Sequence, residues 1–273
     1  MPIKIPPVVR RTKRGHRLNW IPDPNPVRES PHHYAIPPAH IVESLPASVD
    51  LRPFFASHNI SVYDQGSEGS CTAHAWAGCA QYLRAVAKKP NNWVPSRQFI
   101  YWCERFIEND TGTDAGAMVG SGQTALAKWG VCPESTWPYV ASDMLTQPSQ
   151  VAYAQAKPHV LKGGQPIDNR NLKALKSALA LRLPIVNGFL VYSSFESDAV
   201  AQTGIIPMPD AATEQLLGGH STLTVGYDDA KQWFICRNSW SPGWGAQGYF
   251  YMPYNYLTNE AYAQDFHLGH SFS

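Results

Sequence analysis

The chain has 273 residues, 44% of them hydrophobic, and a formal net charge of +1 at pH 7. This length allows one large core or two modest subdomains, and the balanced charge excludes a strong field for nucleic acid or an anionic membrane. No run of 18 apolar residues is present to span a membrane, and five cysteines without a C-x-x-C pair argue against a disulfide scaffold or a zinc ribbon.

The first 46 residues differ from the rest of the chain, because they hold ten of the 23 prolines and show no helical or strand periodicity. Such a segment is extended, polyproline-like or disordered. The segment is basic, and a solvated extension is a simpler interpretation of this charge than weak binding to an anionic partner. No apolar stretch typical of a secretory signal peptide follows. The location of the protein therefore stays open between the cytoplasm and export by another route. We expect an extension over residues 1–45 and a folded domain over residues 46–273.

Four helices are predicted from apolar residues at three- and four-residue steps and from their end signals. The first begins at Cys71, carries Lys88 and Lys89 where they suit the helix dipole, and ends at Pro90. The second opens on Ser96. The predicted helical segments are 71–90, 96–108, 124–130 and 171–184.

Four short segments in the second half are rich in β-branched and aromatic residues and are bounded by Gly, Asp or Pro. They are typical of antiparallel strands, and they cover residues 184–191, 220–228, 232–240 and 248–254. Because helices come first and strands afterwards, the sequence predicts an α+β protein with two lobes.

Cys71 follows the glycine-containing stretch "YDQGSEGS" and lies in the expected first turn of a helix. The positive end of the helix dipole and free backbone N–H groups favour a thiolate there, so this is a suitable place for a nucleophilic sulfur. A buried structural cysteine is the alternative, and it is our interpretation of Cys79, deeper in the same helix. The residues around Cys71 leave both interpretations open.

A thiolate needs a base, and His220 has the most suggestive setting of the ten histidines. It follows two glycines at the start of an apolar strand, and a hairpin would bring Asn238, on the next strand, close to it. His74 lies three residues after Cys71, but no second pair completes a zinc site, so no metal is expected. The other histidines lie in the proline-rich extension, in loop-like segments or in the C-terminal tail (His267 and His270).

Three segments, "QGSEGSC", "GGHS…VGYD" and "RNSWSPGWGAQGYF", look like the signature blocks of papain-like cysteine proteases and occur in that family's order. The chain resembles the family over roughly residues 45 to 256, including the mature-start-like "LPASVDLRP". The resemblance implies a papain-like two-lobed fold, with a helical lobe, an antiparallel β lobe and the active-site cleft between them. It also implies a cysteine endopeptidase that needs no cofactor.

The resemblance further implies that Cys71 attacks the scissile carbonyl while His220 holds it as a thiolate and later protonates the leaving amine. Asn238 would orient the imidazole, and Gln65 would form the oxyanion hole with the backbone N–H of Cys71. Trp240 would cover the hydrogen bond between Asn238 and His220 and floor the primed side of the cleft. Simple core packing is the alternative role for Trp240.

The substrate wall is inferred from "GAMVGSGQTALAKWG", which corresponds in length to the family's glycine-bearing wall. Gly116 and Ala117 would offer their backbone to an extended substrate. Val119, Gly188 and Gly218 would help to form an apolar and fairly roomy second subsite. Each of these residues has an alternative role in a turn or in packing.

The sequence also departs from the family pattern. Glu68 stands where the family carries a cysteine bridged to one near Cys103, and Thr72 replaces the usual tryptophan after the nucleophile. We interpret the missing bridge as tolerance of a reducing compartment or as compensation by packing. Nothing in the proline-rich extension resembles the family's long helical propeptide. We expect part of this extension to fold back over the cleft near Cys71 as an intramolecular inhibitor, anchored around "NWIPDPNP". The alternative is a flexible tail without contact to the site.

Two other functions stay open: a different Cys-His acyl-transfer enzyme (an amidase, a transglutaminase-like protein or an exopeptidase) and a catalytically silent binding module. The complete Cys-His-Asn-Gln set argues against the silent module. We expect peptide or protein substrates, a monomer, and no membrane or nucleic-acid partner. The choice between endo- and exopeptidase activity depends on what blocks the ends of the cleft.

Overall fold

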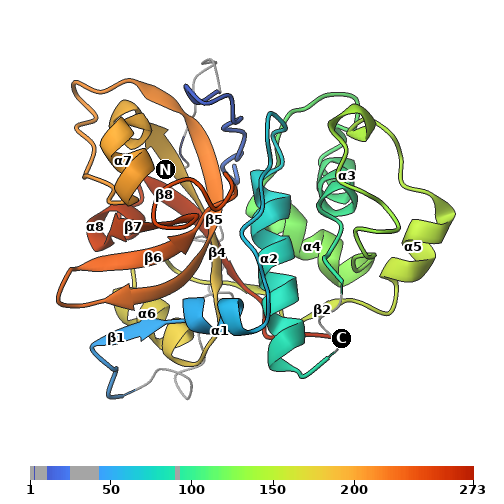
Figure 1. Cartoon of the computed structure of the whole chain (residues 1–273), viewed down its shortest axis with the longest axis horizontal. Helices are drawn as coiled ribbons and strands as arrows, with labels where there is room; N and C mark the ends of the chain where they lie inside the picture. The colour runs from blue at the N-terminus through green and yellow to red at the C-terminus, as the bar shows by residue number, and fades with distance from the viewer. Residues whose placement is uncertain (1–2, 4–10, 25–42, 90–92) are drawn as a thin grey trace.

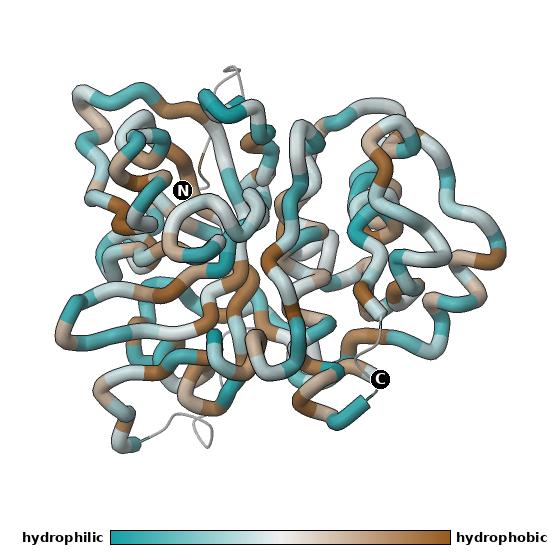
Figure 2. Tube along the Cα trace, in the orientation of Figure 1, coloured by the Kyte–Doolittle hydropathy of each residue, from teal (hydrophilic) through white to brown (hydrophobic). Residues whose placement is uncertain are grey.

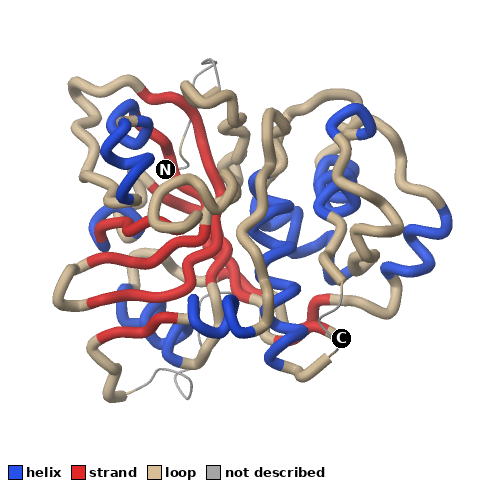
Figure 3. The backbone as a smooth tube through the Cα atoms, viewed as in Figure 1, coloured by secondary structure: helices blue, strands red, loops and turns tan. Residues whose placement is uncertain are grey.

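The computed structural model describes residue 3 and residues 11–24, 43–89 and 93–273. Its elements separate into a lobe of helices and a lobe built on an antiparallel sheet (Figure 1, Figure 3). This arrangement confirms the α+β, two-lobed fold expected from the sequence. Within the described residues, no helix is both long and apolar enough to cross a membrane.

The helical lobe contains α2 (Cys71–Val86), α3 (Arg97–Ile107), α4 (Val119–Lys128), α5 (Gln150–Ala156) and the 3-10 turn η3 (Ala141–Asp143). α2 and α3 form close to where the sequence predicts them. α3 is capped as expected, because the hydroxyl of Ser96 accepts a hydrogen bond from the backbone N–H of Phe99 at 3.0 Å.

α4 begins at Val119, five residues before the predicted start of this helix. Gly120 and Gly122 lower the helix propensity of the segment, so the sequence did not indicate a helix there. Packing explains why Gly122 is tolerated, since a Cβ at this position would lie 2.2 Å from Trp76 Cδ1. The predicted boundary was wrong because a tertiary contact outweighs local propensity.

The β lobe is built on a seven-stranded sheet with the order β3-β8-β4-β5-β6-β7, and β1 pairs with β5. The four predicted strands correspond to β4, β5, β6 and β7. β5 and β6 are joined as a hairpin, with Leu223 opposite Arg237. The strands are β1 (Ser48–Asp50), β3 (Gln165–Pro166), β4 (Ile185–Tyr192), β5 (Leu216–Asp228), β6 (Trp233–Arg237), β7 (Tyr249–Pro253) and β8 (Ala263–Leu268).

β8 was not predicted, because the sequence analysis placed His267 in a C-terminal tail. The strand pairs with β4, with Leu268 opposite Ile185 and His267 opposite Val186. Asp265 and His267 interrupt its apolar pattern, and Asp265 has a φ of 63°. The assignment of this segment to a tail was wrong: strand pairing across the sheet, absent from the local pattern, holds it in place.

The remaining elements cover the ends and faces of the two lobes. α6 was predicted, and the side chain of Asn171 caps it by accepting the N–H of Ala174 at 3.0 Å. These elements are α1 (Arg52–Ser57), α6 (Leu172–Ala180), η4 (Ser193–Glu196), α7 (Asp198–Thr203) and α8 (Tyr254–Leu257), with β2 (Leu161–Lys162) paired to β9 (Ser271–Phe272).

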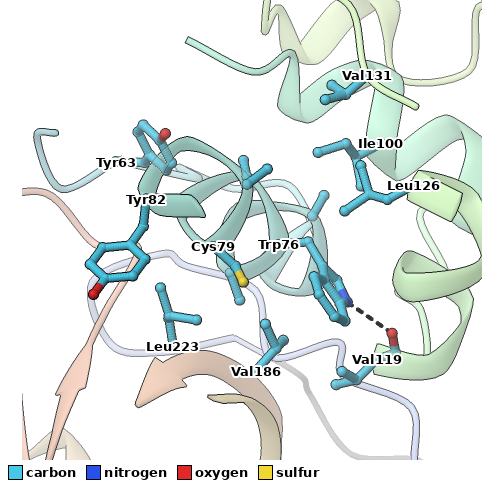
Figure 4. Packing of buried hydrophobic residues seen from close by; sticks show 14 of the residues in the cluster. Tyr63, Trp76, Cys79, Tyr82, Ile100, Val119, Leu126, Val131, Val186 and Leu223 are labelled. Atoms are coloured by element: carbon cyan, nitrogen blue, oxygen red, sulfur yellow. Dashed lines mark hydrogen bonds between the residues drawn. The ribbon is translucent and has the colours of Figure 1, made fainter. Parts of the chain in front are cut away.

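α2 is the centre of the larger hydrophobic core, and all its residues from Cys71 to Ala85 are buried. The indole N–H of Trp76 donates to the carbonyl of Val119 at 2.9 Å, which ties α2 to the start of α4 (Figure 4). A second core lies within the β lobe, and Figure 2 shows hydrophobic residues along the central strands of the sheet. α2 is therefore a rigid support for Cys71, its first residue.

Residues 11–24, which we call the arm, run between β5 and the loop that precedes α2 (dark blue in Figure 1). Leu18 packs into the core of the β lobe, whereas Trp20 packs into the core around α2. Both side chains are fully buried. The arm therefore joins the two lobes at their boundary.

Candidate active site

Cys71 is the first residue of α2 and is fully buried. Burial raises the pKa of its thiol to about 12. Backbone hydrogen bonds from Ser221, Asn19 and Thr72 act in the opposite direction and lower the pKa. Because Asn19 belongs to the arm, the sulfur lies against the arm as well as against β5.

His220 lies on β5, and its Nε2 is 2.8 Å from Asn238 Oδ1. Asn238 directly follows β6, so the hairpin brings the two side chains together. The ring of Trp240 stacks on the imidazole with a centroid distance of 4.8 Å. Burial is the main cause that lowers the pKa of His220 to about 4. Within the described residues Nδ1 of His220 has no hydrogen-bond partner, so this nitrogen is available for a proton.

Gln65 is held from both ends of its side-chain amide. Its Oε1 accepts a hydrogen bond from the hydroxyl of Ser239 at 2.7 Å, and its backbone N–H donates to the carbonyl of the same residue at 2.9 Å. Its Nε2 donates to the carbonyl of Glu68 at 2.9 Å and to that of Arg17 at 3.2 Å. Ser239 was not singled out from the sequence, although it follows Asn238 directly.

The backbone of the arm pairs with both lobes. The N–H of Trp20 donates to the carbonyl of Gly219 on β5 at 3.0 Å. On the other side, Ala117 donates to the carbonyl of Asn19 at 3.2 Å and accepts from the N–H of Ile21 at 3.0 Å. Both bridges, Asn19 with Gly219 and Trp20 with Ala117, are parallel.

Gly116 and Gly188 are two of the glycines at which a side chain would collide with the arm. Gly116 has a φ of +91°, and a Cβ there would lie 1.7 Å from the carbonyl oxygen of Asn19. A Cβ on Gly188 would lie 2.0 Å from Cε2 of the Trp20 indole. The absence of side chains at these positions makes room for the arm.

The other predicted wall residues, Val119 and Gly218, lie next to groups that hold Trp20. Val119, the first residue of α4, is fully buried. Gly218 pairs with Val191 in the β4–β5 ladder and precedes Gly219, which holds the backbone of Trp20. The structure thus brings Gly116, Ala117 and Gly188 into contact with the arm, with Gly218 one residue away from it.

Asp265, which the sequence pattern did not indicate, lies next to the arm. Its Oδ2 accepts the indole N–H of Trp20 at 3.3 Å and the backbone N–H of Val119 at 2.8 Å. Its Oδ1 lies 2.8 Å from His267 Nε2. The sequence-based expectation of an apolar second subsite did not include this carboxylate, which β8 brings to the indole of Trp20.

Polar contacts hold the basic part of the arm. Arg17 forms an ion pair with Asp114 at 2.8 Å, and the ring of His16 stacks on Trp240 with a centroid distance of 5.1 Å. The backbone N–H of Lys13 donates to Glu196 Oε2 at 3.0 Å. The arm is therefore anchored on both sides of the Cys71 region.

The five cysteines all lie in the described part of the chain, and all five are buried free thiols. Cys103 is accordingly unpaired, as expected from Glu68 in place of the family's cysteine. Among the residues that the structure describes, no group of three or more His, Cys, Asp or Glu side chains could hold a metal ion.

The family model described as "Papain family cysteine protease" matches residues 45–265. An uncharacterized peptidase C1-like protein of Acanthamoeba polyphaga mimivirus is 40% identical over 217 residues, which cover 76% of this chain and 68% of that protein. A cathepsin B-like protein of Giardia intestinalis is 31% identical over 215 residues, covering 75% and 68%. Among solved structures, xylellain, a cysteine protease from Xylella fastidiosa, matches with a TM-score of 0.85 and 37% identity over 96% of this chain and 98% of that one.

Proposed function

The chain belongs to the papain family of cysteine proteases, and from this premise we propose that it is an endopeptidase with a Cys71-His220-Asn238 mechanism, kept partly inactive by its own N-terminal extension. In this proposal residues 46–273 form the peptidase domain and residues 1–45 the inhibitory extension. The substrate is a peptide or protein chain that takes the place of the arm.

In the proposed reaction, His220 Nδ1 removes the proton of the Cys71 thiol, and the sulfur attacks the scissile carbonyl carbon. The electron pair of the C=O bond moves to the oxygen. His220 then gives its proton to the leaving amine as the tetrahedral intermediate collapses to a thioester, which water hydrolyses. The buried, unpartnered Nδ1 of His220 supports this assignment, because the other ring nitrogen is already bound to Asn238.

Asn238 and Trp240 act as positioning residues in this scheme. The 2.8 Å contact fixes the orientation of the imidazole and leaves Nδ1 to exchange the proton. The stacked indole of Trp240 covers this contact and keeps water from competing for it. The stacking of Trp240 on His16 of the arm also supports a position of this indole on the primed side of the substrate cleft.

Gln65 supplies one donor of the proposed oxyanion hole, and the backbone N–H of Cys71 supplies the other. Its amide is oriented before substrate arrives, because Ser239 fixes Oε1 and so turns Nε2 toward the arm. A preorganised donor of this kind contributes about 3–4 kcal/mol to transition-state stabilisation.

The arm blocks the reaction in four ways in this proposal. The carbonyl of Arg17 occupies Gln65 Nε2, and the backbone of Asn19 lies against the Cys71 sulfur. The arm also takes the backbone groups of Ala117 that a substrate would use. Burial raises the pKa of Cys71 and lowers that of His220, so the thiolate–imidazolium pair is disfavoured until the arm leaves.

The single observation that carries the proposal is the convergence of Cys71, the His220–Asn238 pair and the Gln65 amide under one stretch of the arm. The test is to incubate the full chain with an epoxide affinity label for papain-like enzymes and to locate the adduct by peptide mass. We expect one adduct, on Cys71, and none on the Cys71→Ser chain. Labelling elsewhere, or none even after the arm is weakened by Trp20→Ala, contradicts the proposal.

A second assay separates the endopeptidase from the alternatives. An internally quenched peptide with both termini blocked is a substrate for an endopeptidase but not for an enzyme that needs a free terminus. We expect cleavage of this peptide and loss of cleavage in Cys71→Ser. Hydrolysis only of simple amides, or only of unblocked peptides, would favour the amidase or the exopeptidase.

A further inference from the structure

Glu196 is a buried carboxylate that contacts the first part of the arm. It lies in η4, it is only 2% exposed, and its Oε2 accepts a hydrogen bond from the backbone N–H of Lys13 at 3.0 Å. Its Oε1 is also buried and has no hydrogen-bond partner among the residues that the structure describes. The arm thus satisfies only one of the two oxygens of this carboxylate.

Ring contacts connect Glu196 to the proposed catalytic pair. Its neighbour Phe195 packs edge-on against Trp240 with a centroid distance of 5.7 Å, and Trp240 stacks on His220 at 4.8 Å. His16 of the arm stacks on the same indole. Because Trp240 lies on the primed side of the cleft in the proposed function, Glu196 lies beside the part of a substrate that follows the scissile bond.

The arm passes this region as a tight turn. The backbone N–H of Thr12 donates to the carbonyl of His16 at 2.8 Å, and that of Gly15 donates to the carbonyl of Thr12 at 3.0 Å. The turn keeps Lys13, which contacts Glu196, close to His16, which contacts the indole. An extended substrate chain would therefore meet Glu196 with one of roughly its first three residues after the scissile bond.

The arm brings positive charge to this end of the cleft. Burial raises the pKa of Glu196, whereas the N–H of Lys13 and the positive charges of Arg14 and Lys13 lower it. Arg14 also pairs with Asp198 at 2.8 Å, although the side chain of Asp198 is 90% exposed. A cationic segment of the chain thus lies on two acidic side chains, of which Glu196 is buried and Asp198 is exposed.

From these contacts we propose, resting on the proposed peptidase function, that Glu196 is a specificity-determining residue for the part of the substrate that follows the scissile bond. It selects substrates with Lys or Arg among roughly the first three residues of this part. Such a side chain brings its charge and its N–H donors to the oxygen that the arm leaves unpaired. An apolar side chain of the same length leaves this oxygen without a partner. A free C-terminal carboxylate is repelled, which disfavours carboxypeptidase activity.

Matched substrates test the proposal on the full chain. Internally quenched peptides with blocked termini and an otherwise uncharged sequence carry Lys or norleucine, its apolar counterpart, at each of these positions in turn, and the cleaved bond is verified by mass. Opening of the arm scales kcat/KM equally for both members of a pair. At one position or more we expect Lys to be favoured about fivefold or more, between the effects of an exposed ion pair and of a hydrogen bond to a buried charge. This preference should decrease with ionic strength.

Variants connect the preference to Glu196. Glu196→Gln removes the charge but keeps an oxygen for the N–H of Lys13, so the arm stays anchored while the preference for Lys should disappear. Asp198→Asn is the matched control, since it removes an exposed negative charge from the same end of the cleft, and it should keep the preference. A peptide that ends in this segment with a free carboxylate should be cleaved more slowly than its amide, and Glu196→Gln should remove this difference as well.

A binding measurement separates this inference from the proposed catalysis. The same peptides, without the quenched pair of labels, are titrated calorimetrically into the full chain carrying Cys71→Ser, with and without Glu196→Gln. The arm competes equally with both members of a pair, so the ratio of their Kd values reports the contact with Glu196. Tighter binding of the Lys peptide, without hydrolysis of any peptide by the unchanged chain, would contradict the peptidase proposal only. Three results overturn the role of Glu196: ratios near one in both binding and kcat/KM, a preference that survives Glu196→Gln, or an equal loss of the preference in Asp198→Asn.

Discussion

The side-chain amide of Gln65 donates a hydrogen bond to the backbone carbonyl of Arg17 at 3.2 Å. A carbonyl oxygen of the arm thus occupies a donor that the proposed mechanism reserves for the oxyanion. The same amide is fixed from behind by Ser239. Inhibition and catalysis therefore depend on one preorganised group.

Replacing Gln65 by Ala should lower kcat by about 100-fold or more with a modest change in KM, because the lost donor acts on the charge that develops in the transition state. Steady-state kinetics on a small peptide substrate measure both constants. An effect confined to KM would mean that Gln65 only binds substrate.

The two cysteines of α2 should behave differently. Cys71→Ser keeps the size of the side chain, so it should abolish hydrolysis while the melting temperature stays close to that of the unchanged chain. Cys79 is buried in the middle of the helix, and Cys79→Ala should cost about 1 kcal/mol or more of stability while activity is kept. Full activity in the Cys71 variant would rule out its role as nucleophile.

Arg17→Ala should activate the enzyme, because it removes the ion pair with Asp114, whose side chain is only 9% exposed. A hydrogen bond to a charged group is worth about 1.5–3 kcal/mol, so a rise of about tenfold in kcat/KM is expected through a larger open fraction. Arg14→Ala is the matched control, since its partner Asp198 is 90% exposed and such pairs contribute little. Equal effects of the two substitutions would show that the Arg17 pair does not hold the arm.

The stability of the protein should depend on pH through Glu68, which stands where the family has a cysteine. Burial, reinforced by Asp114, raises the pKa of its carboxyl to about 8, against an ordinary value of 4.5. The protonated form is favoured in the folded state, so its stabilising contribution is complete below pH 4.5 and is lost as the pH rises to about 8.

Glu68→Gln mimics the protonated carboxyl and should not show this loss. In urea unfolding, its free energy of unfolding relative to the unchanged chain should rise between pH 4.5 and pH 8. Each unit of pKa shift corresponds to about 1.4 kcal/mol, so a relative gain of at least about 1 kcal/mol is expected. Parallel curves for the two chains across this range would show that burial does not perturb Glu68.

The parts of the site predicted from the sequence are those encoded by local signals. Cys71 was singled out as a candidate because a glycine-containing loop leads directly into the first turn of an amphipathic helix. His220 and Asn238 were singled out because one lies on β5 and the other directly follows β6, the two strands of a hairpin, where pairing follows from short chain separation. The resemblance to the papain family then supplied roles that the residues alone left open.

Asp265 could not be found in this way. It reaches the indole of Trp20 through the pairing of β8 with β4, which joins segments far apart in the chain, and its polar neighbours hide the strand pattern. The start of α4 was missed for a related reason, since only the contact of Gly122 with Trp76 reveals the helix. The position of Asp265 and the start of α4 both depend on long-range packing, which the local sequence pattern does not reveal.

Inhibition by the N-terminal extension is tested by comparing kcat/KM on a small peptide substrate for the full chain and for a chain that begins at Ile41. Titration with the epoxide label normalises each preparation to its reactive Cys71, so a partly folded fraction does not enter the comparison. We expect a higher kcat/KM for the shorter chain, by about tenfold or more if the contacts of the arm cost a few kcal/mol to break, and inhibition of this chain by an added peptide of residues 1–40. The same kcat/KM for both chains, with no inhibition by the peptide, would contradict it.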